Sequence, residues 1–262
     1  MDLGQKSVQI FCFSVGVDSL KNLVTAGCSF TLDNYQETWA DYLAQRLDYK
    51  LTNLGARGAG IDFVAKRIMY HCSRNATDLI VVMLPSVDRF DWYLDQHHPL
   101  RASGISIASW QNGHSPSLVT LDGQSNHVEG YSLSGGEIRG HKRHWFKYYY
   151  STTSALLNYW TTVYNLENFF KIKNIPYYFT TAYDRDNLVE QSYNQTQNSG
   201  TFSWIFDCID WNRFVFYQTD RGFLSFAKDQ NFDIVSNHPV TQAHSSWVDN
   251  VVLKKLNYQH PG

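Results

Sequence analysis

The sequence predicts an α/β fold with a doubly wound parallel sheet. Short apolar runs alternate with segments of helical periodicity along most of the 262 residues. The run between Asp78 and Pro85 is unbroken, which is typical of a central parallel strand covered on both faces. Polar and glycine-rich residues follow the runs, at the strand ends where such sheets bind ligands. The length favours one domain, residues 1–262, with an insertion at about residues 91–150.

The first part of the chain predicts three strands and two helices. The first strand runs from Leu23 to Ala26 and ends before Ser29, which is predicted to lie on the turn into a helix that opens at Asp33 and Asn34. In parallel α/β folds, a turn of this kind can expose a nucleophilic side chain. The N-terminus of the following helix would then stabilise the oxyanion that forms when the nucleophile attacks a carbonyl. The later elements are a strand at Lys50–Leu54, a helix from Ile61 to Cys72 and the strand at Asp78–Pro85.

The second part of the chain is more irregular. Residues 91–150 have no sustained periodicity, which predicts a cap, a binding insertion or a small β-rich subdomain. Their six histidines are expected to be polar loop residues rather than metal ligands. The remaining predicted elements are a helix at Thr153–Ile172, a strand at Pro176–Ala182, a short helix and strand within Trp204–Phe216, and a last helix at Thr241–Leu256.

Composition excludes several classes of protein. A net charge of −2 excludes the broad basic surface of a nucleic-acid binder, and no apolar stretch is long enough to cross a membrane. Asp18 and Lys21 interrupt the N-terminal apolar run, which argues against a signal peptide. The four cysteines have no zinc-site spacing, so we expect reduced thiols and a cytoplasmic location. The high aromatic content, 16%, suggests a groove for a sugar, a base or a partner.

Four polar motifs follow one another in a characteristic order. They are Gly27-x-Ser29, Asn53-x-Gly55-x-x-Gly58, Pro85-Ser86-Val87-Asp88 and His238-Pro239. This order resembles that of the SGNH hydrolases, also called GDSL esterases and lipases. The resemblance implies a three-layer α/β/α sandwich of flavodoxin-like type, with the irregular aromatic-rich insertions outside it. It also implies a small-molecule or glycan ester as substrate, with no cofactor and no metal.

The resemblance assigns roles to the matching residues. Ser29 corresponds to the nucleophile, His238 to the general base, and Gly58 to a donor that offers its backbone N–H to the oxyanion. Asn53 opens the motif that contains Gly58. A serine hydroxyl is a poor nucleophile until a base accepts its proton, so the pair matters more than either residue. His244 is a competing base, although a packed or capping role is expected inside the last helix.

One departure from the family pattern concerns the oxyanion. Val87 occupies the position of the asparagine whose side-chain amide normally donates to it. Loss of one such donor lowers the rate by about 10²- to 10³-fold. Ser86 or Arg89, from the same turn, could replace that donor.

A second departure concerns the base. The family carries an aspartate two or three positions before the histidine, and Ser236 and Val235 occupy those positions here. Loss of the orienting carboxylate lowers the rate by about 10⁴-fold in serine proteases. Either Asp233 or a backbone carbonyl could hold the His238 ring instead.

Three functions therefore stay open. The first is a serine ester hydrolase, with an acetyl group on a sugar as one candidate ester. The second is a non-catalytic binding module of the same fold for a glycan or a protein partner, since a decayed active site would show these departures. The third is a nucleotide-binding domain, which is disfavoured because the glycine-rich loop follows the second strand rather than the first. We expect no nucleic-acid or membrane partner, and the sequence does not predict an oligomeric state.

Overall fold

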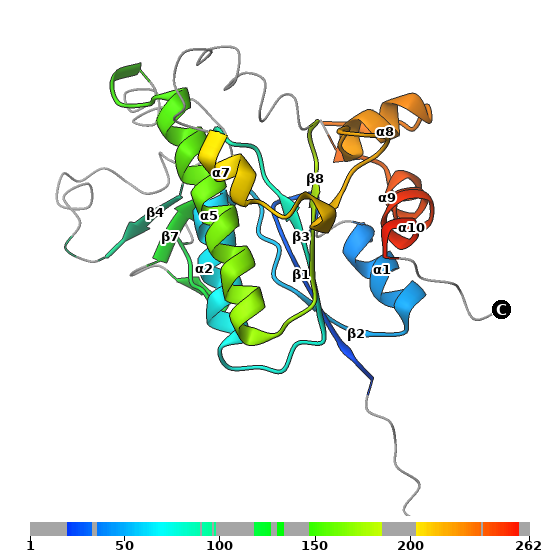
Figure 1. Ribbon diagram of the computed structural model, residues 1–262, viewed down its shortest axis with the longest axis horizontal. Coiled ribbons are helices and arrows are strands. Elements are labelled where there is room, and N and C mark those ends of the chain that lie inside the picture. The colour runs from blue at the N-terminus through cyan, green and yellow to red at the C-terminus, as the bar shows by residue number, and fades with distance from the viewer. Residues whose placement is uncertain are drawn as a thin grey trace, which may run out of the picture.

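The centre of the molecule is a parallel sheet of five strands between two layers of helices (Figure 1). The spatial order β2-β1-β3-β8-β9 is the flavodoxin-like order of a doubly wound sheet, so the predicted fold class is confirmed. The computed structural model describes residues 20–32, 36–89, 91–95, 97, 118–126, 130–133, 147–184, 203–236 and 238–256.

The five strands of the central sheet all run in the same direction. In the register of this sheet, Val24 of β1 lies opposite Thr52 of β2 on one side and Ile80 of β3 on the other. The strands are β2 (Lys50–Asn53), β1 (Asn22–Ala26), β3 (Leu79–Leu84), β8 (Tyr177–Thr181) and β9 (Phe214–Val215).

The central strand β3 separates two hydrophobic cores. Ile80, Val82 and Leu84 pack into one core, whereas Val81 and Met83 pack into the other. All five side chains are fully buried. Because successive side chains of a strand point to opposite faces, an unbroken apolar run is what a sheet covered on both faces requires.

Helices form the two outer layers, which Figure 1 shows on either side of the sheet. One core is closed by α2 (Ile61–Cys72), α5 (Thr152–Lys173) and α7 (Ser203–Cys208). A short 3-10 turn, η2 (Trp211–Arg213), precedes β9. The other core is closed by α1 (Trp39–Leu47), α8 (Phe223–Asp229), α9 (Thr241–Trp247), the π-helical η3 (Val248–Val252) and α10 (Leu253–Lys255).

Helix α1 begins at Trp39, so the prediction that helical structure opens before this residue is wrong for residues 36–38. Its N-cap is Thr38, whose backbone N–H donates to Asp41 Oδ2 at 2.8 Å in a capping box. The Trp39 N–H donates to Nδ1 of the buried His244 at 3.1 Å. His244 therefore has the predicted packed and capping role, while Asp33 and Asn34 lie outside the described residues.

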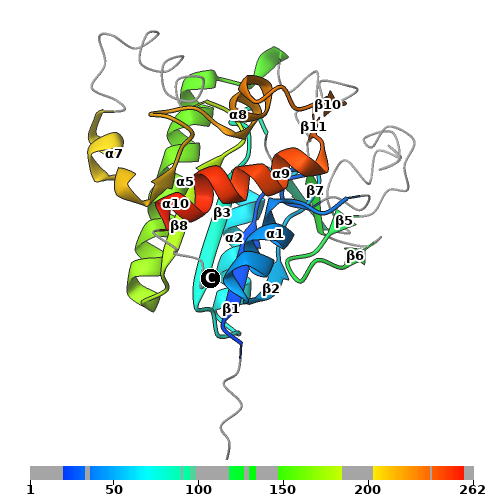
Figure 2. The same cartoon turned by 90° about the vertical axis from the view of Figure 1, so that its right-hand side faces the viewer.

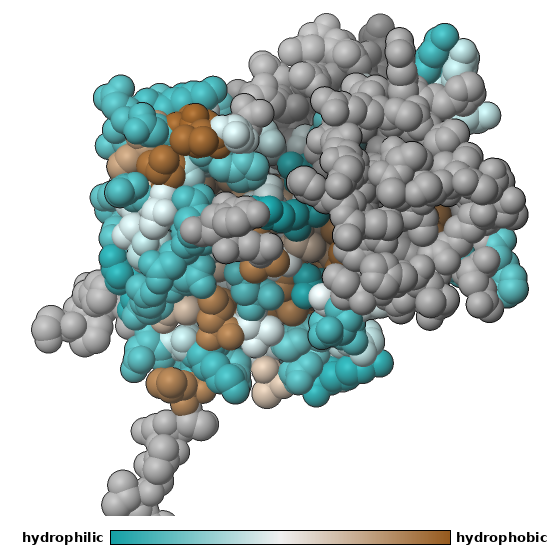
Figure 3. Space-filling model, turned by 180° about the vertical axis from the view of Figure 1, so that it is seen from behind, coloured by the Kyte–Doolittle hydropathy of each residue, from teal (hydrophilic) through white to brown (hydrophobic). Residues whose placement is uncertain are grey.

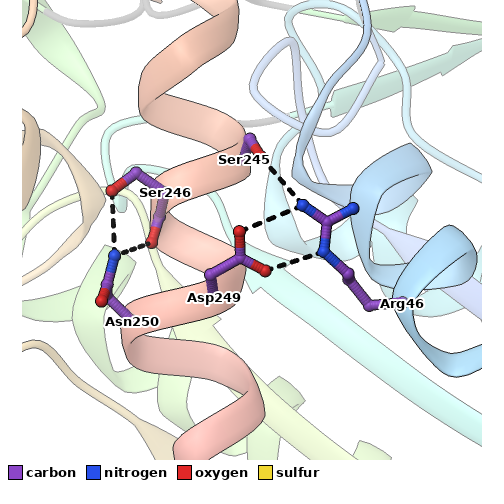
Figure 4. Close-up of polar contacts among 5 residues, drawn as sticks. All are labelled: Arg46, Ser245, Ser246, Asp249 and Asn250. Carbon is purple, nitrogen blue, oxygen red and sulfur yellow. Dashed lines mark hydrogen bonds and ion pairs between the residues drawn. The ribbon is translucent and has the colours of Figure 1, made fainter. Parts of the chain in front are cut away.

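A polar cluster joins α1 to the C-terminal helical segment (Figure 4). Arg46 donates from Nε to Asp249 Oδ1 at 2.9 Å and from Nη2 to Asp249 Oδ2 at 3.1 Å, and Nη2 also reaches Ser245 Oγ at 3.4 Å. On the same segment, Asn250 Nδ2 donates to the carbonyl and the hydroxyl oxygen of Ser246, each at 3.1 Å. Ion pairs this exposed contribute at most about 1 kcal/mol. They link α1 to the C-terminal segment beside the core that both elements cover.

The described part of the insertion forms a second, antiparallel sheet in the order β4-β7-β5-β6. Figure 1 shows β4 and β7 beside α2, and the ring of Tyr131 packs edge-on against Phe63 of α2 at 5.2 Å between centroids. The described residues thus match the β-rich alternative for residues 91–150. The strands are β4 (Asp91–Leu94), β7 (Gly130–Leu133), β5 (Leu118–Val119) and β6 (Ser125–Asn126).

The surface carries apolar side chains singly or in small groups. Figure 3 shows that the described part of the back face is largely hydrophilic, with separate hydrophobic patches. Among the described residues, no helix is both long enough and apolar enough to span a bilayer. Cys28 and Cys72 are buried and Cys208 is exposed, and all three are free thiols.

Candidate active site

Ser29 lies on a turn directly after β1. The Thr31 N–H donates to the Cys28 carbonyl oxygen at 2.9 Å, which closes the turn around Ser29. Gly27 precedes this turn with a φ of +154°, and a Cβ there would lie 2.6 Å from the Met83 carbonyl oxygen and overlap Thr31 Oγ1. Only glycine fits at this position, so Gly27 fixes the path by which the chain leaves the sheet.

The position of Ser29 at the end of the first strand is confirmed, but no helix follows it directly. In the described part of the chain, the first helix is α1, which begins at Trp39. The expected contribution of a helix N-terminus to the Ser29 site is therefore wrong. The described residues between Ser29 and α1 therefore place no helix N-terminus directly after Ser29.

His238 lies on a short hairpin rather than in an open loop. It belongs to β11 (His238–Pro239), which pairs antiparallel with β10 (Ile234–Val235), and Ser236 adopts a left-handed φ of +50° between them. Figure 2 shows this hairpin at the upper end of the central sheet, the end toward which the strands run. Ser29 and His238 therefore meet at the carboxyl edge of the sheet, where parallel α/β folds place their ligand sites.

The side chains of Ser29 and His238 are in direct contact. His238 Nε2 lies 2.7 Å from Ser29 Oγ, and His238 Nδ1 lies 2.9 Å from the carbonyl oxygen of Ser236. A carbonyl oxygen only accepts hydrogen bonds, so Nδ1 must carry the proton and donate to it. In the neutral ring Nε2 is then the acceptor, and the Ser29 hydroxyl donates to it. This is the tautomer that a general base for Ser29 requires.

The group that orients His238 is a backbone carbonyl and not Asp233. Of the two predicted alternatives, the structure places the Ser236 carbonyl on Nδ1. Asp233 precedes β10, its backbone oxygen accepts from the Val240 N–H at 3.1 Å, and its exposed side chain has no hydrogen bond to His238 in the described part of the chain. The hairpin reverses at Ser236, so the turn carbonyl meets the ring and the carboxylate of Asp233 does not.

An aromatic side chain fixes the plane of the His238 ring. Phe30 stacks on it with 4.9 Å between the centroids and 26° between the planes. Phe30 is buried and is itself held edge-on by Tyr183 at 6.2 Å and by Phe223 at 6.3 Å. The residue next to Ser29 in the sequence therefore positions the His238 ring. No sequence pattern indicates this role, since stacking depends on the distant hairpin.

Gly58 brings a backbone N–H to the same site. It has a left-handed φ of +78° and lines the cleft together with Ser29 and His238. Among the described residues, neither the Gly58 N–H nor the Ser29 N–H donates to another protein group. Two N–H groups in one cleft that the fold leaves unused are suitable donors for a developing oxyanion.

Asn53 and Arg67 hold the loop that carries Gly58. Asn53 Nδ2 donates to the Thr31 carbonyl oxygen at 2.7 Å, and Asn53 Oδ1 accepts from the Gly55 N–H at 2.9 Å. Asn53 therefore ties the second loop to the first and is a positioning residue. Arg67, from α2, donates through Nη1 to the carbonyl oxygens of Leu54 and Gly55 at 3.0 and 2.9 Å. Sequence analysis missed Arg67, which occurs within an amphipathic helix and gives no local signal.

The third loop contributes Arg89 to the cleft. Arg89 lines the cavity that contains Ser29, whereas the Ser86 hydroxyl donates to Asp88 Oδ1 and Ser86 is not among the residues that line it. Arg89 Nη1 donates weakly to the Ala59 carbonyl oxygen at 3.4 Å. Its guanidinium also interacts electrostatically with the Cys28 thiol and the Tyr183 phenol. Of the two predicted substitutes for the missing asparagine, only Arg89 lines the same cleft as Ser29.

The cleft at Ser29 has a volume of about 730 Å³, within the usual range for small-molecule sites. Of the described residues that line it, two are arginines and none is acidic. Its lining residues are Ser29, Gln36, Arg57, Gly58, Arg89, Val235, Ser236, His238, Pro239 and Val240.

No protein-family model and no curated protein matches this chain. Among solved structures, it is similar to an acetylxylan esterase from Geobacillus stearothermophilus, with 12% identity, a TM-score of 0.44, and 91% of this chain and 95% of that chain covered. A putative GDSL-like lipase from Parabacteroides merdae matches with 12% identity, a TM-score of 0.43 and coverage of 88% and 96%. An acetyl xylan esterase from the rumen bacterium Butyrivibrio proteoclasticus matches with 10% identity, a TM-score of 0.37 and coverage of 96% and 66%. At such identities the similarity concerns the fold and nothing finer.

Proposed function

We propose that this protein is a serine-dependent ester hydrolase with a Ser29–His238 dyad. The observation that carries the proposal is the 2.7 Å contact between Ser29 Oγ and His238 Nε2, in a ring whose other nitrogen is held by the Ser236 carbonyl. A hydroxyl that donates to a correctly oriented imidazole, inside a cleft at the carboxyl edge of a parallel sheet, is an activated nucleophile.

The first half of the reaction forms an acyl-enzyme. Ser29 Oγ attacks the ester carbonyl carbon while its proton moves to His238 Nε2. The carbonyl oxygen becomes an oxyanion, toward which the Ser29 and Gly58 N–H groups are available as donors. When the intermediate collapses, the bond to the alcohol oxygen breaks and His238 Nε2 returns its proton to that oxygen. The alcohol leaves, and the acyl group stays on Ser29.

The second half restores the enzyme. A water molecule attacks the acyl carbon, and His238 Nε2 takes one of its protons. Collapse of this second intermediate breaks the bond to Ser29 Oγ, which regains the proton as the acid departs. The charged imidazolium formed in each half is stabilised by the neutral Ser236 carbonyl rather than by a carboxylate. We therefore infer a dyad that is slower than a complete triad.

The ester is proposed to be an acetyl ester of a carbohydrate. An acetyl group is the smallest common acyl group and requires no separate acyl pocket. Among the described residues, the apolar side of the cleft is formed by Val235, Pro239 and Val240, which offer a surface for a methyl group. A neighbouring cavity lined by tyrosine, serine and asparagine side chains offers a site for the carbohydrate part.

The test is covalent labelling with a fluorophosphonate, which reacts with activated serines. We expect stoichiometric modification of Ser29, mapped by mass spectrometry, and loss of the label in Ser29→Ala and His238→Ala. His97→Ala is the matched control, since His97 is exposed and does not line the cleft. A folded native protein that takes no label would contradict the proposal and favour a binding module of the same fold.

A further inference from the structure

A second cavity, of about 210 Å³, lies beside the cleft that contains Ser29. Arg89 lines both of them, so the two cavities meet at its side chain. The second cavity takes most of its wall from the start of α5 and the residues before it. Its lining residues are Ile61, Val87, Arg89, Tyr149, Tyr150, Ser151, Ser154, Ala155 and Asn158.

The walls of this cavity combine aromatic, apolar and neutral hydrogen-bonding groups. Ser154 and Asn158 are exposed and lie one turn apart on α5, so both side chains are on the same face of the helix. Tyr149 lines the cavity and is 67% exposed. A sugar ring presents C–H groups on its faces and hydroxyls at its edge. Tyrosine rings with a nearby amide and hydroxyl match both parts.

The charge at the junction points to an anionic ligand. Arg57 and Arg89 line the Ser29 cleft, and none of the described residues that line either cavity is acidic. Asp88 lines neither cavity, but its carboxylate interacts electrostatically with Arg89 and Tyr150. The same carboxylate accepts a hydrogen bond from the Ser86 hydroxyl. Guanidinium groups bind carboxylates in a two-pronged geometry. An acid group on the ligand would therefore be held where the two cavities meet.

We propose that the cavity lined by Tyr149, Ser154 and Asn158 is a subsite for a hexuronic acid residue, with the sugar carboxylate at Arg89. This inference rests on the proposed function and deepens it. The substrate is then an acetylated acidic polysaccharide fragment, whose ester lies at Ser29 while an acidic sugar occupies the subsite. Because Arg89 lines both cavities, it would select the substrate by charge as well as by shape.

The test measures binding without turnover, in the Ser29→Ala variant. Calorimetric titration with a trimer of galacturonic acid is compared with titration of neutral xylotriose. We expect the acidic trimer to bind at least about tenfold more tightly at low salt, and the difference to shrink as the salt concentration rises, since the contact is partly exposed and screened. Equal affinity for the two trimers would overturn the proposal.

Side-chain variants place the ligand in the cavity. In the Ser29→Ala background, Asn158→Ala is expected to weaken binding of the acidic trimer by about fivefold, the loss of one hydrogen bond. Asn165→Ala is the matched control, because Asn165 is an exposed asparagine on the same helix that lines neither cavity. Arg89→Gln is expected to abolish the preference for the acidic over the neutral trimer, and retained binding of the neutral trimer shows that this variant is folded. Equal effects of Asn158→Ala and Asn165→Ala would overturn the subsite.

The two proposals fail separately. A native protein that labels with the fluorophosphonate, but whose Ser29→Ala variant binds both trimers alike, keeps the hydrolase and loses the acidic subsite. A protein that takes no label but binds the acidic trimer through Asn158 is a glycan-binding module, so the hydrolase proposal fails, and with it the inference that the bound acidic sugar carries an ester to be cleaved.

Discussion

The substitution Asp91→Asn tests how the glycine-rich loop is anchored. The Asp91 carboxylate accepts the Gly60 N–H at 2.9 Å and the Phe63 N–H at 3.0 Å, at the start of α2. Burial raises the pKa of Asp91 from 3.8 to about 6, although these two hydrogen bonds and Arg89 act in the opposite direction. Asp91 therefore pairs with backbone donors at a site where its charge is poorly solvated.

The expected magnitude follows from the pKa shift. In the window between pH 3.8 and about 6, the folded protein keeps a proton that the unfolded chain has released, so stability falls as the pH rises through this window. One pKa unit corresponds to about 1.4 kcal/mol. We expect the free energy of unfolding of the native protein, relative to that of Asp91→Asn, to be about 2–3 kcal/mol larger at pH 4 than at pH 7.

The assay is urea unfolding followed by tryptophan fluorescence, at pH 4 and pH 7, for both proteins. Comparing two pH values cancels any fixed effect of placing an amide group beside Gly60. Asp207→Asn is the matched control, since Asp207 is exposed. A pH-dependent difference below about 0.5 kcal/mol, or one of opposite sign, would refute the reasoning that Asp91 is desolvated.

Three further predictions concern the site. Asp233→Ala is expected to change kcat/KM for an aryl acetate by less than about twofold, whereas removal of a true triad carboxylate lowers the rate about 10⁴-fold, so a large loss would place Asp233 on His238 after all. Phe30→Leu is expected to lower kcat by about tenfold with little change in KM, because the His238 ring loses its stacking partner; equal kcat values would contradict a positioning role. Gly27→Ala is expected to destabilise the protein by about 2–3 kcal/mol in urea unfolding, since the new Cβ would overlap Thr31 Oγ1 and the Met83 carbonyl; an unchanged midpoint would contradict this.

The long periodic elements could be predicted from the sequence with nearly correct bounds. The helix predicted at Ile61–Cys72 has those bounds in the structure, and the strand predicted at Asp78–Pro85 is shorter by one residue at each end. Such elements have enough turns or alternations for burial to dictate the pattern. The start of α1 was misplaced because polar residues continue across it, although Thr38 and Asp41 have capping-box spacing.

The short elements could not be predicted, and the position of the His238 ring depends on one of them. Strands β9, β10 and β11 have two residues each, too few to show any alternation. The sequence therefore indicated His238 but left open what holds it, because the Ser236 carbonyl reaches the ring only through the turn of the hairpin. For the same reason, the sequence does not distinguish between Arg89 and Ser86 as the replacement for the asparagine that normally donates to the oxyanion. Only three-dimensional placement separates a side chain that lines the cleft from one paired with Asp88.

The distance along the chain between Ser29 and His238 has a consequence for how activity is acquired. The two residues are 209 positions apart, and the hairpin that carries His238 precedes the last helix, which His244 and Asp249 attach to α1. Long-range contacts of this kind form late, after the loop-closure entropy between them has been overcome. Under the proposed function, Ser29 therefore lacks its base in a nascent or refolding chain until the C-terminal segment has docked. The rate at which Ser29 becomes reactive during refolding is then a measure of this last step of folding.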